Sequence, residues 1–280
     1  MAAINSPSLW WKAFPKPSDD GHKYDRGHAL VLSGGAAQTG GARLAAQAAL
    51  RVGAGLVTVM SPPSAVIVNA SHLTAVMLRA VADADELAAV MDDQRITCAI
   101  AGPALGFSKT ARAKVDALLR CRQKLVLDAD ALTMHAEASD AFFSKLGSHG
   151  LAVLTPHEGE FKRLFPDLDG PREARAAHAA KRSGAVVTLK GAETIVASPK
   201  GSIVRNEHAT PWLATAGSGD VLAGVIGGLM AQGMEPFDAA CAGVWLHGDA
   251  GRRCGPALIS EDLDAGLRRS LAALFETPPT

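Results

Sequence analysis

The sequence predicts an α/β fold in which a central, mostly parallel sheet is covered by helices on both faces. Short apolar runs recur along the first two thirds of the chain, with helical patterns between most of them. The predicted strands are residues 29–32, 56–60, 97–101, 125–127, 151–154 and 185–189. This alternation is typical of a parallel sheet, whose strands are buried on both sides.

The remaining elements complete one domain. Residues 194–197 and 202–205 flank a Ser-Pro-Lys-Gly turn, which predicts an antiparallel hairpin at the edge of the sheet. Residues 1–20 contain Pro15, Pro17 and two acidic residues, and we expect an extended lead-in before a domain over residues 21–280. Helices are expected over residues 42–51, 220–232, about 236–253 and 261–275.

Composition excludes several classes of protein. The 280 residues include 28 basic and 28 acidic side chains, so no broad positive surface for nucleic acid is expected. No apolar stretch is both long and free of glycine or charge, which predicts a soluble protein without a membrane span. The four cysteines show neither paired nor metal-ligand spacing, as is typical of the reducing cytoplasm.

The most informative segment is the Ala-Gly-Ser-Gly-Asp turn at 216–220, which opens an apolar helix rich in small residues. Amides of Gly217, Ser218 and Gly219 can form an anion hole at the start of this helix, with Asp220 beside a bound phosphate. The segment lacks the spacing and lysine of the Walker P-loop. An ordinary loop, with Asp220 as a favourable first-turn charge, is the alternative.

Polar groups also follow several predicted strands, where ligands of α/β sheets bind. The Gly-rich segment 33–41 lacks Rossmann spacing and is either a substrate contact or a tight turn. Residues 101–106 offer backbone amides to a substrate. Asp128 is a candidate to organise the site or to hold magnesium-bound water, whereas Asp130 is explained by capping of the following helix.

Two later strand ends carry further candidates. In Thr-Pro-His-Glu-Gly-Glu at 155–160, His157 can touch a polar ligand, Glu158 is explained by capping, and Glu160 can bind water around a nucleotide-associated magnesium ion. Lys190 follows a strand, where it either meets nucleotide phosphates or is a solvated turn charge. His247 and Asp249, on a late helix, are expected to be structural.

Together these segments resemble the ADP/ATP-dependent NAD(P)H-hydrate dehydratases of the ribokinase-like superfamily, over roughly residues 20–275. Small-molecule kinases of this superfamily typically carry Asn at the position of His157, so the Thr-Pro-His form favours the dehydratases. The Lys-Gly-x-x-Thr stretch at 190–194 points the same way. Gly41 stands where the family often has Ala, and Ala104 where many members have Gly.

The resemblance implies a ribokinase-like three-layer sandwich and a set of site residues. The residues expected to contact the hydrated nicotinamide nucleotide are Gly41, Gly106, His157 and Asp220. Those expected to contact the adenine nucleotide are Lys190, Gly191, Ala192, Glu193, Thr194 and Gly219. Asp220 is expected to be the catalytic base.

The implied reaction repairs a damaged cofactor. ADP or ATP, with magnesium, phosphorylates the 6-hydroxyl of hydrated NADH or NADPH; phosphate then leaves and the ring double bond re-forms. The resemblance also implies a homo-oligomer. Only about 20 residues precede the matching region, too few for an epimerase domain, so epimerisation of the hydrate is expected to be supplied elsewhere or to occur spontaneously. The alternatives are a small-alcohol kinase and a catalytically silent nucleotide-binding regulator.

Overall fold

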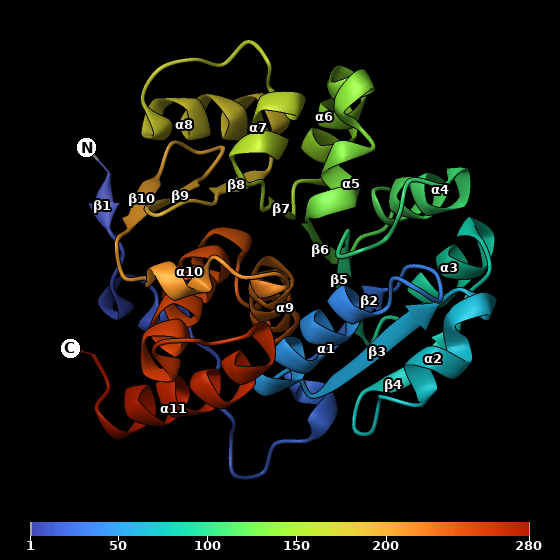
Figure 1. Cartoon of the computed structure of the whole chain (residues 1–280), viewed down its shortest axis with the longest axis horizontal. Helices are drawn as coiled ribbons and strands as arrows, with labels where there is room; N and C mark the ends of the chain where they lie inside the picture. Colours follow the sequence, from blue (N-terminus) through green and yellow to red (C-terminus); the bar gives the residue numbers. More distant parts are fainter. Residues whose placement is uncertain (1, 280) are drawn as a thin grey trace.

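A computed structural model describes residues 2–279. Across these residues one ten-stranded sheet has the order β1-β10-β9-β8-β7-β6-β5-β2-β3-β4, with helices on both faces (Figure 1). The strands are β1 Ala3–Ile4, β2 His28–Leu32, β3 Leu56–Ser61, β4 Met77–Ala80, β5 Ile96–Ala101, β6 Lys124–Leu127, β7 Ala152–Leu154, β8 Val186–Leu189, β9 Thr194–Ala197 and β10 Ile203–Asn206. The predicted three-layer α/β architecture is confirmed.

The sheet is parallel from β8 to β4, and β9 runs antiparallel to both of its neighbours. The predicted hairpin is therefore present as β9 and β10. It does not end the sheet, because β1 pairs with β10 in parallel. The sequence analysis missed β1 and β4, since these short strands are largely exposed and lack the apolar runs that mark the central strands.

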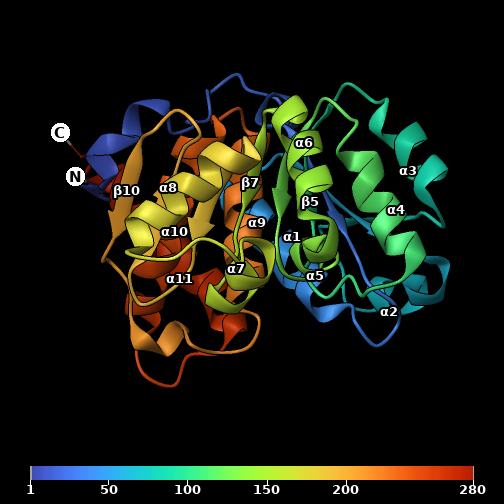
Figure 2. The same ribbon diagram turned by 90° about the horizontal axis from the view of Figure 1, so that it is seen from above.

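The helices form two layers. Helices α1, α9, α10 and α11 cover one face of the sheet, and α3 to α8 cover the other (Figures 1 and 2). Their bounds are α1 Gly40–Arg51, α2 Val66–Ala70, α3 Ala84–Met91, α4 Lys109–Leu118, α5 Ala129–Thr133, α6 Ser139–His149, α7 Glu158–Leu164, α8 Arg172–Ser183, α9 Ser218–Ala231, α10 Pro236–Cys254 and α11 Leu263–Glu276.

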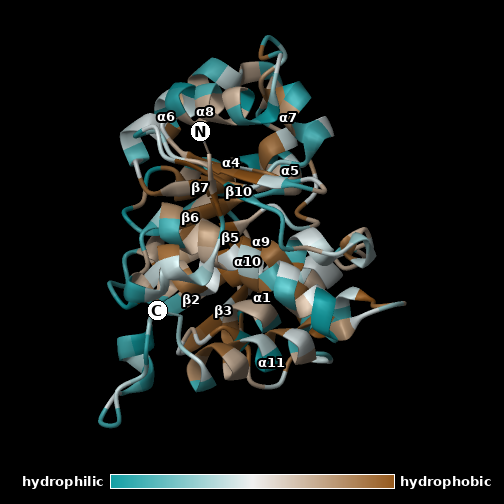
Figure 3. Cartoon of the chain, turned by 90° about the vertical axis from the view of Figure 1, so that its left-hand side faces the viewer, coloured by the Kyte–Doolittle hydropathy of each residue, from teal (hydrophilic) through white to brown (hydrophobic). Residues whose placement is uncertain are grey.

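Each face of the sheet has its own hydrophobic core. Successive residues of a strand point to opposite faces, so Leu30 joins the core under α3 to α8 and Val31 joins the core under α1, α9 and α10. Figure 3 shows hydrophobic colours concentrated on the strands and hydrophilic colours on the outer helices. The sandwich buries both faces of the sheet, as a parallel sheet requires.

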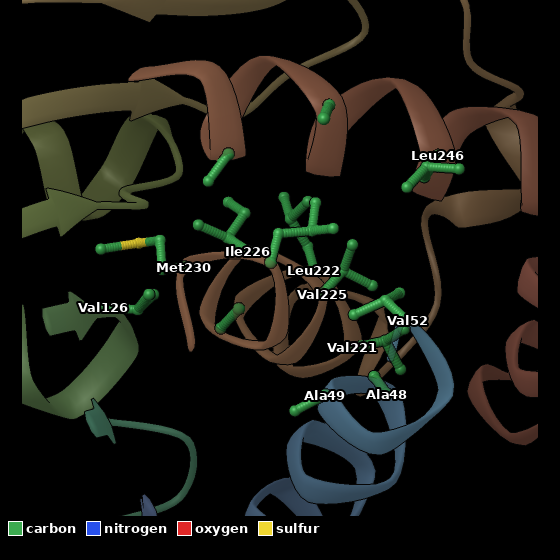
Figure 4. Packing of buried hydrophobic residues seen from close by; sticks show 14 of the residues in the cluster. Ala48, Ala49, Val52, Val126, Val221, Leu222, Val225, Ile226, Met230 and Leu246 are labelled. Carbon is green, nitrogen blue, oxygen red and sulfur yellow. The ribbon is translucent and has the colours of Figure 1, made fainter. Parts of the chain in front are cut away.

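Helix α9 lies between α1 and α10, in the core on their side of the sheet. Its apolar side chains meet α1 on one side and α10 on the other (Figure 4). At Gly224 the backbones approach so closely that a Cβ atom would lie 2.2 Å from the carbonyl oxygen of Ala45. This packing fixes α9 and therefore holds its amino-terminal turn in place over the ends of the strands.

The amino-terminal segment differs from the expected extended lead-in. Trp10, Trp11 and Phe14 are buried, and the ring centroids of Trp10 and Trp245 of α10 lie 5.9 Å apart. The free energy gained by burying these large aromatic side chains packs the segment against the domain, although the prolines that follow it favour turns. Both termini lie near the β1 and β10 end of the sheet (Figures 1 and 2).

Ala104 adopts a left-handed backbone conformation, with φ of 47°. A Cβ atom is strained there, so we expect Ala104→Gly to raise the free energy of unfolding by about 0.5–1 kcal/mol despite glycine's extra freedom in the unfolded chain. Urea denaturation measures this change. Ala113→Gly, on the exposed face of α4, is the control and should lower stability by about 1 kcal/mol. Equal losses in both variants would contradict the prediction.

Candidate active site

The first turn of α9 forms one wall of the candidate site. Gly217 precedes the helix with φ of 85°, a left-handed conformation that suits glycine. Ser218 Oγ lies 3.0 Å from Nε2 of the buried His247, and Ser260 Oγ donates to the carbonyl of Ala216 at 2.6 Å. First-turn amides of a helix have no intrahelical acceptor, so this turn can bind an anion.

Asp220 lies in that turn with its carboxylate close to α1. A Cβ atom placed on Gly41 would lie 2.8 Å from Oδ2 of Asp220. Among residues 2–279, no hydrogen-bond donor to the Asp220 carboxylate is found, and no side chain caps α9. Burial, followed by the charge of Asp128, raises the pKa of Asp220 to about 6, while Lys190 opposes the shift. A carboxylate with this pKa can accept a proton at neutral pH.

Lys190 and Asp128 form a buried ion pair below the same turn. Their Nζ and Oδ1 atoms are 2.7 Å apart, and the Asp128 side chain is only 2% exposed. A Cβ atom on Gly219 would lie 3.2 Å from Nζ of Lys190 and 3.8 Å from Oδ2 of Asp128. The interpretation of Lys190 as a solvated turn charge is therefore wrong, because its ammonium group points inward, toward the anion-binding turn.

The His157 segment lies beside the Lys190 segment. The backbone amide of Lys190 donates a hydrogen bond of 2.9 Å to the carbonyl of Pro156. This bond joins the segments that follow β7 and β8. His157 caps the amino-terminal end of α7: its Nδ1 accepts from the amide of Gly159 at 3.0 Å, so the neutral ring carries its proton on Nε2. The His157 side chain is 55% exposed, which leaves the ring accessible to a ligand.

Glu160 completes the cap of α7 from inside the site. Its Oε2 accepts the amide of His157 at 2.8 Å, and its Oε1 lies 3.3 Å from His157 Nε2. Burial raises the pKa of Glu160, and the nearby charge of Lys190 opposes that rise. Within residues 2–279, no three His, Cys, Asp or Glu side chains are placed to hold a metal ion by themselves.

Two carboxylates differ from the capping roles expected for them. Asp130 accepts the amide of Gly106 at 2.8 Å and so holds the 101–106 turn, and α5 has no side-chain cap. Glu158 forms salt bridges with Arg172 at 2.7 Å and Arg175 at 2.5 Å. Both carboxylates are engaged by groups from other segments, which local sequence patterns do not reveal.

The structure thus gathers most of the predicted residues around the first turn of α9. Gly41, Gly219 and Lys190 adjoin this turn directly, and His157 is linked to it through Lys190. Gly106 is held by Asp130, whose charge also raises the pKa of Asp220. Gly191, Ala192 and Glu193 lie in the adjoining 190–193 turn between β8 and β9, and Oγ1 of Thr194, the first residue of β9, lies 3.3 Å from the carbonyl oxygen of Gly191.

The sequence analysis missed two groups that shape this site. His247 was expected to be only structural, yet it contacts Ser218, and burial lowers its pKa to about 4, so its imidazole is neutral at pH 7. Arg172 touches the turn between β8 and β9. A late-helix histidine followed by Gly248 and other small residues was the only available signal for His247, and Arg172 had none.

The sheet order and the site at the strand ends define a ribokinase-like protein. A ribokinase-like superfamily protein from Enterococcus faecalis has the same fold, with a TM-score of 0.83 and 21% identity over 97% of this chain and 96% of that one. A family model described as NAD(P)H-hydrate dehydratase matches residues 29–258. The chain belongs to this family.

Named relatives agree with this assignment. The ADP-dependent (S)-NAD(P)H-hydrate dehydratase of Neisseria meningitidis is 38% identical over 85% of this chain and 80% of its own length. The ADP/ATP-dependent NAD(P)H-hydrate dehydratase of Bacillus subtilis, co-crystallised with ATP and Mg²⁺, has a TM-score of 0.80 and 25% identity over 97% of this chain and 98% of that one.

The chain spans about half the length of several bifunctional NAD(P)H-hydrate repair enzymes that it also matches, such as that of Thermosynechococcus vestitus, which is 38% identical over 94% of this chain and 54% of its own. Over residues 2–279, no helix combines the length and the apolar character that a membrane crossing needs.

Proposed function

We propose that this chain is an ADP- or ATP-dependent (S)-NAD(P)H-hydrate dehydratase. The observation that carries the proposal is the position of Asp220, a partly buried carboxylate that has no hydrogen-bond donor among residues 2–279, in the first turn of an anion-binding helix. Lys190, from the Lys-Gly-x-x-Thr segment, adjoins this turn, and His157, from the Thr-Pro-His segment, is bridged to Lys190. Family membership supports the same activity.

In the proposed reaction Asp220 accepts the proton of the 6-hydroxyl as that oxygen attacks the terminal phosphoryl group of the nucleotide. Amides of Gly217, Ser218 and Gly219, with Lys190, stabilise the negative charge on the transferring group. Phosphate is a far better leaving group than hydroxide, so it departs from the ring carbon while the neighbouring ring carbon loses a proton, and the ring double bond re-forms. Gly41, Gly106 and His157 would contact the hydrate, and residues 190–194 the adenine nucleotide.

We also propose that Mg²⁺ accompanies the nucleotide. The convergence of Asp128, Glu160 and Asp220 on one anion-binding turn fits a hard cation that keeps most of its waters. Both oxygens of Glu160 already contact His157. Glu160 would therefore hold the ion through a water molecule and not bind it directly. When bound, the ion would neutralise charge on the phosphates.

A coupled assay tests the activity. The protein is incubated with NADH hydrate and Mg²⁺, with ADP, with ATP or with neither, and absorbance of the reduced nicotinamide is followed. We expect reduced cofactor to re-form only when a nucleotide is present. A stable phosphorylated alcohol without regenerated cofactor would support the small-alcohol kinase. Nucleotide binding without any turnover would support the silent regulator.

The pH dependence of kcat/KM reports the ionisation of the proposed base, Asp220. Asp220 must be ionised to accept a proton, so the rate should fall as the pH drops below about 6, approaching tenfold per pH unit. Initial rates between pH 5 and pH 8.5, at fixed ionic strength, measure this limb. A rate that stays constant down to pH 5 would contradict a base of this pKa.

A further inference from the structure

The guanidinium of Arg172, at the first residue of α8, lies under the turn between β8 and β9. Its Nη2 donates to the carbonyls of Leu189 and Lys190, each at 3.1 Å, and to that of Glu193 at 3.4 Å. Three carbonyls from both ends of one four-residue turn thus converge on a single nitrogen. Charge-assisted hydrogen bonds of this kind are stronger than those between neutral groups.

The other side of the guanidinium is tied to the His157 segment. Nη1 of Arg172 donates to Oε2 of Glu158 at 2.7 Å, and Glu158 directly follows His157. Arg175 donates to Oε1 of the same carboxylate at 2.5 Å but contacts none of the carbonyls of the turn. Arg172 therefore bridges the turn and α7, whereas Arg175 holds Glu158 and lies over the ring of Phe161 without reaching the turn.

The turn rests directly on this side chain. A Cβ atom on Gly191 would lie 2.6 Å from Nη2 of Arg172 and 3.0 Å from its Cζ. The carbonyl of Lys190 points toward the guanidinium, so in a planar trans peptide the amide of Gly191 points away from it. That amide lies 3.4 Å from Oγ1 of Thr194, whereas within residues 2–279 the amides of Ala192 and Glu193 donate to no other group of the chain.

We propose that Arg172 is a positioning residue for the adenine nucleotide. It gathers the carbonyls of Leu189, Lys190 and Glu193 on one side and leaves the amides of Ala192 and Glu193 free for the phosphates or ribose of ADP or ATP on the other. Glu158 anchors the guanidinium and so joins the nucleotide turn to the segment that carries His157. This inference rests on the proposed function, in which residues 190–194 bind the nucleotide.

Arg172→Gln tests the proposal, with Arg175→Gln as the matched control on the same carboxylate. The dissociation constant of ADP with Mg²⁺ is measured by calorimetry, and KM for each substrate by the coupled assay. For Arg172→Gln we expect nucleotide binding to weaken about tenfold, as loss of charge-assisted hydrogen bonds predicts, with hydrate KM and kcat at saturation within about twofold of wild type. Arg175→Gln should leave nucleotide binding within about twofold.

Thermal unfolding of each variant separates positioning from stability. If Arg172→Gln does not fold, Arg172→Lys carries the test: it keeps the charge but cannot hold three carbonyls and Glu158 at once, so nucleotide binding should again weaken. Equal effects of the Arg172 and Arg175 variants, or equal increases in KM for both substrates, would overturn the proposal. Failure of the wild-type chain to bind ADP or ATP would instead refute the proposed function.

Discussion

Asp220→Asn is expected to lower kcat by at least about a hundredfold in the coupled assay, since loss of a general base typically costs 10²–10⁴-fold. The amide preserves the shape of the side chain next to Gly41 but cannot accept the hydroxyl proton. Nucleotide binding, measured by calorimetry, should change little because it depends on other groups. Near-normal turnover would contradict the role of Asp220 as the base.

Stability provides the control for this variant. The pKa of Asp220 rises from its usual 3.8 to about 6 on folding, so the folded chain loses stability between these pH values and carries the full penalty above pH 6. Asp220→Asn removes the buried charge and should be more stable than wild type at pH 8, by up to about 3 kcal/mol. Urea denaturation measures the difference.

Asp140→Asn, in the first turn of α6, is the matched variant. It removes a first-turn carboxylate and its ion pair with Arg182, so we expect unchanged kcat and a small loss of stability. If Asp220→Asn lost stability as Asp140→Asn does, the role of Asp220 would be to stabilise the amino-terminal end of α9 by its charge and not to act in the reaction.

Lys190→Ala is expected to weaken ADP or ATP binding about 10- to 100-fold, more than it weakens hydrate binding, because a cation next to the anion-binding turn is lost. A second effect follows from the ion pair. Asp128 is left buried and unpaired, and the lowering influence of Lys190 on the pKa of Asp220 disappears. The acid limb of the pH profile should therefore move to higher pH.

The double variant with Lys190→Ala and Asp128→Asn separates these two effects. Neutralising Asp128 removes the charge that raises the pKa of Asp220, so the acid limb should move back toward lower pH while nucleotide binding stays weak. An unchanged nucleotide dissociation constant in Lys190→Ala would contradict the phosphate role of this lysine. It would leave Lys190 only as the partner of Asp128.

Much of the fold could be predicted because its signals are local. The central strands are buried on both faces and therefore appear as apolar runs, and the turn before Asp220 is marked by glycines that its backbone requires. The exposed strands β1 and β4 gave no such signal. Trp10 and Trp11 were assigned to a lead-in because their partners in α10 and α11 lie more than 200 residues away in the chain.

The sequence by itself determined the three-layer architecture, the α9 turn with Asp220, and the strand ends that carry His157 and Lys190. Only the tertiary structure decided how their charges pair. Lys190 meets Asp128 across 62 residues, Asp130 holds Gly106 across 24, and Arg172 reaches a turn whose sequence gives no sign of it. Periodicity and turn chemistry act between near neighbours, whereas the partner of a buried charge depends on which strand ends the sheet brings together.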